Sequence, residues 1–301
     1  MNGKYQLHTI DLHFQGLAET IASYVVEGPD GLVMVETGPG STLENALAGL
    51  AELGFKPADV GHILLTHIHF DHAGAAGWWA QQGARIYVHH FGARHLIAPE
   101  KLIASASRIY GELMGPLWGD ILPAPAENVV ALYDGDRVEA AGLTFIAHET
   151  PGHARHHHVY QLEDIAFTGD AAGILLPKFN LPDIPAPPPE FDLNVWLETV
   201  DKIGALPVKA LYPTHFGRIA GKETHLAAIK QLLRDSAQFV KERMESGMDR
   251  DTLVEQYTQW NRERARQAGL SEEGIRHYET VNPLYMSVDG IMRYWRKRKE
   301  K

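Results

Sequence analysis

One short stretch, Leu64–Gly74, constrains the fold of this chain more than any other. It reads LLTHIHFDHAG, so three histidines and one aspartate fall within six residues directly after an apolar run. Imidazole and carboxylate groups at this density are typical of a zinc, iron or manganese site. The apolar run predicts a buried strand, and the small residues 73–76 allow a helix to begin close to the site. The chain must therefore present these side chains at the end of a rigid strand.

The spacing within this stretch favours two metal ions over one. His67 and His69 are two residues apart, and strand alternation would point both imidazoles to the same side. Asp71 and His72 follow as the chain turns into the helix, so they can reach the same point from another direction. A single ion would not use all four groups alongside further ligands downstream, whereas two adjacent ions would.

Three further candidates lie downstream, and each follows an apolar, strand-like run that meets a glycine-bearing turn. They are His153 in ETPGHARHH, Asp170 in AFTGDAAG and His215 in LYPTHFG. Such a turn is a usual place for a site residue on a rigid scaffold. Taken singly, they could equally be a turn residue, a helix cap and a loop histidine. Together with the first stretch they complete a ligand set for a two-metal hydrolytic centre.

The order of strand-like and helical segments predicts an α+β chain rather than a purely parallel sheet. Residues 21–28 and 31–38 favour a hairpin, and 43–54 favour a helix. From about residue 221 the sequence becomes helical, amphipathic and rich in charge. We therefore expect a catalytic domain over residues 1–220. We expect residues 221–301 to form a C-terminal α-helical extension that packs on the core or builds a dimer interface.

Composition limits the partners that we expect. The chain has no cysteine, which excludes disulfides and thiolate chemistry, and its formal net charge of −10 disfavours a nucleic-acid surface. No apolar run approaches the ~20 residues of a membrane helix, and the first residues lack an export signal. We expect a cytoplasmic protein with a small-molecule substrate, without nucleic acid or membrane as partner, and leave a homodimer open. We interpret the basic residues near the end as a solvated terminus: Arg293, Arg296, Lys297, Arg298, Lys299 and Lys301.

The motifs HIHFDHAG, TPGH, TGD and PTHFG, in this order, resemble the metallo-β-lactamase-fold hydrolase superfamily over roughly residues 20–220. The similarity is greatest to its HxHxDH branch, which includes glyoxalase II-type thioesterases and quorum-quenching lactonases. This resemblance implies a four-layer αβ/βα sandwich with metals at the edge between two sheets. It also implies three ligand groups, which are His67, His69 and His153 for one metal, Asp71, His72 and His215 for the other, and Asp170 as the bridge.

The implied cofactors are two divalent metal ions, zinc first, with iron or manganese as alternatives. Two adjacent cations lower the pKa of a bridging water from about 15.7 towards neutrality. The resulting hydroxide would attack an ester, thioester or lactone carbonyl. Asp170 and Asp71 are the expected catalytic carboxylates, and Asp71 could also orient the hydroxide or carry a proton.

The resemblance discriminates poorly among substrates. We find no clear match to the glutathione-binding positions of glyoxalase II, and Ala171 follows Asp170 where lactonases soon have a tyrosine. A phosphodiesterase-type hydrolase is one alternative, although the acidic charge argues against it. A mononuclear iron oxidoreductase similar to sulfur dioxygenases is another.

Several residues could support the site without binding metal. Glu36 stands where the family usually has aspartate, and a longer side chain there would shift any contact with a ligand. In the run His156–His158, strand alternation would place the first and third histidines on one face. The irregular segments 91–125 and 174–191 could form walls of an apolar substrate pocket through Trp118, Phe179 and Phe191.

Overall fold

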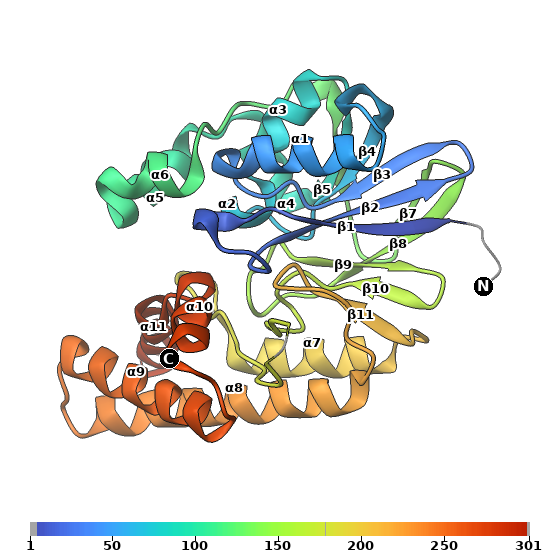
Figure 1. The fold of residues 1–301 in the computed structure, drawn as a ribbon. Coiled ribbons are helices and arrows are strands. Elements are labelled where there is room, and N and C mark those ends of the chain that lie inside the picture. Colours follow the sequence, from blue (N-terminus) through green and yellow to red (C-terminus); the bar gives the residue numbers. More distant parts are fainter. Residues whose placement is uncertain (1–4, 178, 300–301) are drawn as a thin grey trace. The chain divides into compact units, whose positions relative to one another are not determined.

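The computed structural model describes residues 5–177 and 179–299, which form two compact units (Figure 1). Unit 1 runs to Glu149 and also includes His156–Gly169, whereas unit 2 comprises Thr150–Arg155 and the chain from Asp170 onward. The boundary expected near residue 221 falls inside unit 2. The division into a 1–220 domain and a 221–301 extension therefore stays a prediction.

A six-stranded mixed sheet forms the framework of unit 1. Its order follows the chain, with β1 (Gln6–Asp11), β2 (Ala22–Gly28), β3 (Gly31–Val35), β4 (Val60–Leu64), β5 (Arg85–His89) and β6 (Val129–Leu132). The first three strands pair antiparallel, and the predicted hairpin is confirmed as β2 and β3. The strands from β3 to β6 pair parallel, so their carboxyl ends meet at one edge of the sheet.

Helices connect the parallel strands of unit 1. They are α1 (Leu43–Glu52), α2 (Phe70–Ala73), α3 (Ala76–Gln81), α4 (His90–Ile97), α5 (Glu100–Tyr110) and α6 (Met114–Trp118). The helix expected over 43–54 is confirmed as α1, which buries Leu50 in the core. Trp118 is also buried, and its ring packs against those of Phe14 and Phe70 at centroid distances of 5.8 and 6.0 Å. Trp118 therefore belongs to the core of unit 1.

Unit 1 also contains four antiparallel strands of a second sheet. They are β7 (Arg137–Ala140), β8 (Leu143–Glu149), β9 (His158–Leu162) and β10 (Ile165–Phe167). The buried hydroxyl of Tyr160 in β9 donates hydrogen bonds to the carbonyls of Leu65 and Tyr87. This side chain ties β9 to the backbone just beyond β4 and within β5, where the candidate ligands begin.

Unit 2 is mainly helical. Its elements are α7 (Leu193–Ala205), β11 (Ala210–Tyr212), α8 (Lys222–Glu245), α9 (Arg250–Gln267), α10 (Glu272–Val281) and α11 (Leu284–Lys299). The long helix α8 packs beside α7, α9 and α11 (Figure 1). Asp192, Asp249 and Ser271 cap α7, α9 and α10 by accepting hydrogen bonds from backbone N–H groups of the first turn.

The last two helices hold the proline-rich segment of unit 2. Asn282 donates hydrogen bonds to Asp183 Oδ2 and the Ile184 carbonyl, at 2.8 and 3.0 Å. Gly290 of α11 approaches the backbone so closely that a Cβ would lie 1.9 Å from the Ala186 carbonyl oxygen. The helical end of the chain is thus packed against residues 183–187.

Within the described ranges, none of the helices combines the length and the hydropathy that a membrane crossing requires.

Candidate metal centre

The first group of candidate ligands follows the carboxyl end of β4. Ligands commonly bind at the carboxyl ends of parallel strands, where loops converge. His67 and His69 lie in the loop beyond β4, and His69 is the residue before α2. The prediction that strand alternation aligns these two rings is therefore wrong, because the strand ends at Leu64 and the chain turns towards α2.

We call His67, His69, Asp71 and His72 the His67 cluster, and all four lie in unit 1. His67 Nε2 and His69 Nδ1 are 2.9 Å apart. His72 Nε2 lies 3.6 Å from Asp71 Oδ2. His67 and His72 are fully buried, with ring centroids 4.0 Å apart, while His69 and Asp71 are partly exposed. The loop thus gathers three imidazoles and one carboxylate, with one side open to solvent.

The buried carboxylate of Glu36 determines how two of these rings are oriented. Glu36 follows β3 with a φ of 64°, and its Oε1 accepts a 2.5 Å hydrogen bond from the Thr66 hydroxyl. The same Oε1 lies 3.3 Å from His72 Nδ1. A carboxylate can only accept, so the His72 proton lies on Nδ1, and a neutral ring presents a lone pair at Nε2.

Thr66 fixes the position of the ring proton of His67 in the same way. Its hydroxyl hydrogen is directed at Glu36, so its oxygen is left to accept from His67 Nδ1 at 3.1 Å. A neutral His67 therefore also presents its Nε2 lone pair, on the side of His69. Glu36 thus contacts a candidate ligand, His72, although its side chain is longer than the aspartate that is usual in the family.

A second group lies in unit 2, and we call His153, Asp170 and His215 the Asp170 cluster. His153 Nε2 lies 3.4 Å from Asp170 Oδ2, and His215 Nε2 lies 3.6 Å from Asp170 Oδ1. All three side chains are buried. His153 Nδ1 donates a 2.8 Å hydrogen bond to the Pro185 carbonyl, which leaves its Nε2 lone pair towards Asp170. Each oxygen of Asp170 thus faces a different imidazole.

The donor chemistry of both clusters fits divalent cations. In each, an imidazole nitrogen whose ring proton lies on Nδ1 faces a carboxylate oxygen at 3.4 to 3.6 Å. Two acceptors repel each other unless a cation or an additional proton lies between them. Metal-binding histidines typically donate their other N–H to a carboxylate or a backbone carbonyl, as His72 and His153 do. The structure therefore brings four predicted ligands together in unit 1 and three in unit 2.

The histidine run after His153 lies partly outside the strand. The strand β9 begins at His158, so the predicted alternation across His156–His158 is wrong. Both His156 and His157 stack on His67, at centroid distances of 6.0 and 4.9 Å. Gly169 makes room for this arrangement, since a Cβ there would lie 2.3 Å from Thr66 Oγ1 and 2.7 Å from His157 Nε2.

A further group in unit 1 consists of His89, His90 and Glu149, whose ligand atoms also lie close together. His89 Nδ1 accepts a hydrogen bond from the Phe91 N–H, so the ring proton lies on Nε2 and is donated to Glu149 at 2.8 Å. Burial, and then the neighbouring His90, lower the pKa of His89. Because both ring nitrogens already serve hydrogen bonds, we interpret this group as a cap of α4 rather than a metal site.

Sequence reasoning missed the groups that hold the ligand rings in place. They are the Thr66 hydroxyl, the Pro185 carbonyl and the Trp196 ring, which contacts His153 at a centroid distance of 5.5 Å. These residues are chemically ordinary, and two of them lie more than 30 positions from the histidine they contact. No pattern in the sequence marks them.

Known proteins share this arrangement of elements. The family described as the Metallo-beta-lactamase superfamily matches residues 18–215, which is more than half of the chain. The curated "Metallo-beta-lactamase fold-containing protein ST1585" of Sulfurisphaera tokodaii is 29% identical over 233 residues, covering 75% of this chain and 84% of that protein. Its solved structure aligns with a TM-score of 0.61, 26% identity, and coverage of 76% and 85% of the two chains.

Two other solved structures show the same fold at lower identity. The metallo-beta-lactamase family protein TTHA1429 from Thermus thermophilus covers 98% of this chain and 94% of its own, with a TM-score of 0.72 and 22% identity. BJP-1, a subclass B3 metallo-beta-lactamase of Bradyrhizobium japonicum, covers 82% of this chain and 95% of its own, with a TM-score of 0.55 and 20% identity. The expected fold, with mixed sheets and a C-terminal helical region, is confirmed.

Proposed function

The chain belongs to the metallo-β-lactamase superfamily, and on that premise we propose that it is a hydrolase of ester, thioester or lactone carbonyls that uses two divalent metal ions. Members of this superfamily are mostly metal-dependent hydrolases, and the fold implies divalent metal binding. The observation that carries the proposal is the pairing of imidazole lone pairs with carboxylate oxygens in both clusters. Two such acceptors stay this close only with a cation or a proton between them.

The ligands that we propose are those of the His67 cluster and the Asp170 cluster. Zinc is our first choice of metal, because imidazole and carboxylate ligands without thiolate suit it well, and iron and manganese remain alternatives. When bound, the ions would supply an activated water near neutral pH and polarise the substrate carbonyl. We also propose that the protein acts in the cytoplasm.

The chain's own residues would position the reactants and move protons. Asp71 is partly exposed, with 22% of its side chain accessible, so it can accept a proton near the carbonyl and release it to solvent. Asp170 is buried between two imidazoles and presents a separate oxygen to each, so it would share a bound cation with them. Glu36 and Thr66 fix the rings of His72 and His67 before substrate arrives.

The test combines metal analysis with a panel of substrates. Metal content and hydrolysis of thioesters, lactones, aryl esters and phosphodiesters are measured for the natural protein and for Asp170→Ala. We expect two metal ions per chain in the natural protein, with carbonyl substrates preferred. The variant should lose bound metal and at least ~100-fold in kcat/KM, because it removes the one carboxylate of the Asp170 cluster.

The control and a milder variant make the result interpretable. Asp251→Ala removes a carboxylate of α9 that is 86% exposed and should change neither metal content nor rate. Asp170→Asn keeps the shape of the side chain if the alanine variant fails to fold. Undiminished activity in a folded Asp170 variant would refute the proposal, as would a preference for phosphodiesters.

A further inference from the structure

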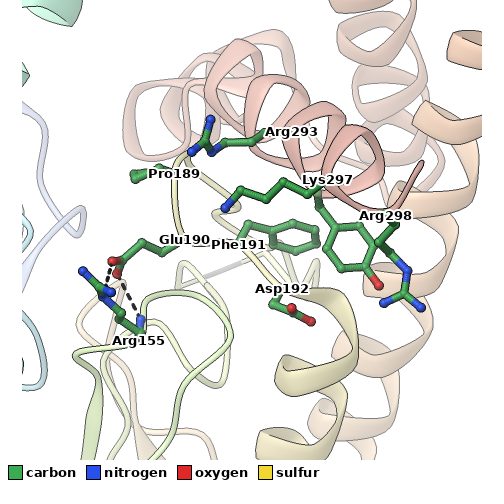
Figure 2. Close-up of a pocket in the computed structure, with 9 residues that line it drawn as sticks. Arg155, Pro189, Glu190, Phe191, Asp192, Arg293, Lys297 and Arg298 are labelled. Atoms are coloured by element: carbon green, nitrogen blue, oxygen red, sulfur yellow. Dashed lines mark hydrogen bonds and ion pairs between the residues drawn. The ribbon is translucent and has the colours of Figure 1, made fainter. Parts of the chain in front are cut away.

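A large cavity lies in unit 2, between the proline-rich segment and the last helix (Figure 2). Its volume is about 860 Å³. We call it the α11 pocket, and its lining consists of Arg155, Pro189, Glu190, Phe191, Asp192, Arg293, Tyr294, Lys297 and Arg298. Small-molecule sites commonly occupy about 300 to 1,000 Å³. The α11 pocket is therefore large enough for a nucleotide-sized molecule.

The charges of the α11 pocket favour an anion. Arg293 and Lys297 lie one helical turn apart on α11, and among the described residues neither forms an ion pair with a carboxylate. Arg155 is already paired with Glu190, at 2.7 Å. Asp192 is occupied as the cap of α7. Within the described residues, two exposed cations thus have no carboxylate partner, in a chain whose formal net charge is −10.

The floor of the α11 pocket is aromatic. The rings of Phe191 and Tyr294 meet edge to face at a centroid distance of 5.6 Å, and both side chains are largely buried. Arg298 lies over the Tyr294 ring, 5.4 Å from its centroid. Burial is the main cause that raises the pKa of Tyr294, so the phenol stays neutral beside an anion. A surface of this kind suits an organic group attached to the anion rather than a bare ion.

The α11 pocket adjoins the Asp170 cluster within unit 2. Arg155 is two residues beyond the ligand His153. The Trp196 ring contacts His153 on one side and Phe191 on the other, at centroid distances of 5.5 and 6.0 Å. One buried indole therefore separates a cluster histidine from the pocket floor.

We propose that the α11 pocket binds the phosphate-bearing end of a nucleotide-sized ligand. Guanidinium and ammonium groups together recognise phosphate, the former through paired N–H donors and the latter as a point charge. This assignment rests on the proposed function. If the protein hydrolyses thioesters, the pocket binds the part of the substrate that is remote from the carbonyl. The favoured substrate is then a phosphorylated acyl thioester such as an acyl-coenzyme A. Arg293, Lys297 and Arg298, which we interpreted from the sequence as part of a solvated terminus, would thereby gain a role.

The first test measures binding alone. Isothermal titration of the full-length, metal-loaded protein uses ADP and inorganic pyrophosphate as probes. We expect ADP to bind, and the double variant Arg293→Glu/Lys297→Glu to weaken binding at least ~10-fold, because it replaces two groups that attract phosphate with two that repel it. Arg296→Glu reverses one charge, half the change of the double variant, on an exposed position of α11 outside the pocket and should alter the Kd by less than about twofold.

Three results would overturn the proposal. The first is that ADP does not bind detectably, and the second is that the double variant binds ADP as tightly as the natural protein. The third is that pyrophosphate binds as tightly as ADP, which would show that the pocket does not recognise the organic part of the ligand. Circular dichroism establishes that the double variant is folded. Arg293→Ala serves as a milder variant, with a smaller loss expected in the same direction.

The second test separates this proposal from the proposed function. The KM for an acyl-coenzyme A is compared with that for a phosphate-free thioester carrying the same acyl group. We expect the ratio of the two KM values to rise at least ~10-fold in the double variant and to stay constant in Arg296→Glu. Charge-dependent ADP binding without hydrolysis of any ester, thioester or lactone would refute the proposed function and leave the phosphate site standing. Hydrolysis with an unchanged KM ratio would refute the substrate assignment.

Discussion

At the scale of single residues, Glu36 and Thr66 determine which nitrogen each ring of the His67 cluster presents. We expect Glu36→Gln to weaken metal binding about 10- to 100-fold, as is usual when a partner behind a metal-binding histidine is altered. The amide keeps the size of the side chain but removes its negative charge, and its NH2 group replaces the Oε2 that accepts from the Thr66 N–H. Competition with a chromogenic chelator measures the affinity.

The matched control for this prediction is Glu44→Gln. Glu44 is exposed in the first turn of α1, and its substitution should leave metal affinity within about twofold. An unchanged affinity in the Glu36 variant would show that the carboxylate is not needed to orient the rings.

Gly169 supports the same cluster by having no side chain. It adopts a φ of 49°, and a Cβ would collide with Thr66 Oγ1 and His157 Nε2. Gly54 also has a positive φ, of 86°, but nothing lies within 4 Å of its missing Cβ. We expect Gly169→Ala to lower the free energy of unfolding by about 1 to 3 kcal/mol more than Gly54→Ala, through overpacking. Urea denaturation measures both, and equal losses would contradict a steric cause.

The candidate ligands could be predicted from the sequence, whereas the residues that orient their rings could not. The ligands are rare residue types gathered in short motifs, so HxHxDH is recognisable without a structure. Thr66 is an ordinary residue whose importance comes from Glu36, 30 positions earlier. Arg293 and Lys297 read as a solvated tail, because a charge pattern carries no information about the cavity beside it.

At the scale of elements, α8 supports the turn that carries Asp170. His225 of α8 is buried and donates a 2.7 Å hydrogen bond from Nε2 to the Ala172 carbonyl. Burial lowers its pKa, although the hydrogen bond to the carbonyl opposes this. In the unfolded chain this histidine therefore binds a proton more readily than in the folded protein. Its contribution to the free energy of unfolding is fully present above about pH 6.5 and is lost as the pH drops towards its pKa in the folded protein.

We expect His225→Gln to reduce this acid sensitivity. The urea midpoint of the natural protein should fall more between about pH 7.5 and 5.5 than that of the variant, because glutamine does not titrate. His13→Gln, at a position where 53% of the side chain is exposed, should leave the pH dependence unchanged. Parallel midpoint curves for the natural protein and the His225 variant would contradict the prediction.

Most elements could be predicted from local patterns, but their ends could not. The hairpin of β2 and β3 and the helix α1 follow from glycine positions and apolar spacing. The start of β9 at His158 was missed, because His156 and His157 are diverted to pack on His67, and that contact depends on tertiary structure.

At the scale of the whole molecule, bound metal should contribute to stability. A ligand that binds only the folded state at 100 times its Kd adds about 2.7 kcal/mol. We expect removal of metal by a chelator to lower the melting temperature by several degrees, and added Zn²⁺ to restore it. Asp170→Asn should show a smaller response to the chelator. An identical melting temperature with and without metal would contradict the ligand assignment.

The division into two units has a consequence for how the protein can be made. The chain enters unit 2 for residues 150–155, returns to unit 1 for 156–169, and then leaves it. A nascent chain therefore exposes His153 well before Pro185 and Trp196, which hold its ring, have been synthesised. A single cut anywhere between Glu36 and His215 separates cluster residues from one another or from a supporting side chain. Expression of separate halves should yield no competent protein, and the full set of proposed metal ligands exists only once synthesis has passed His215.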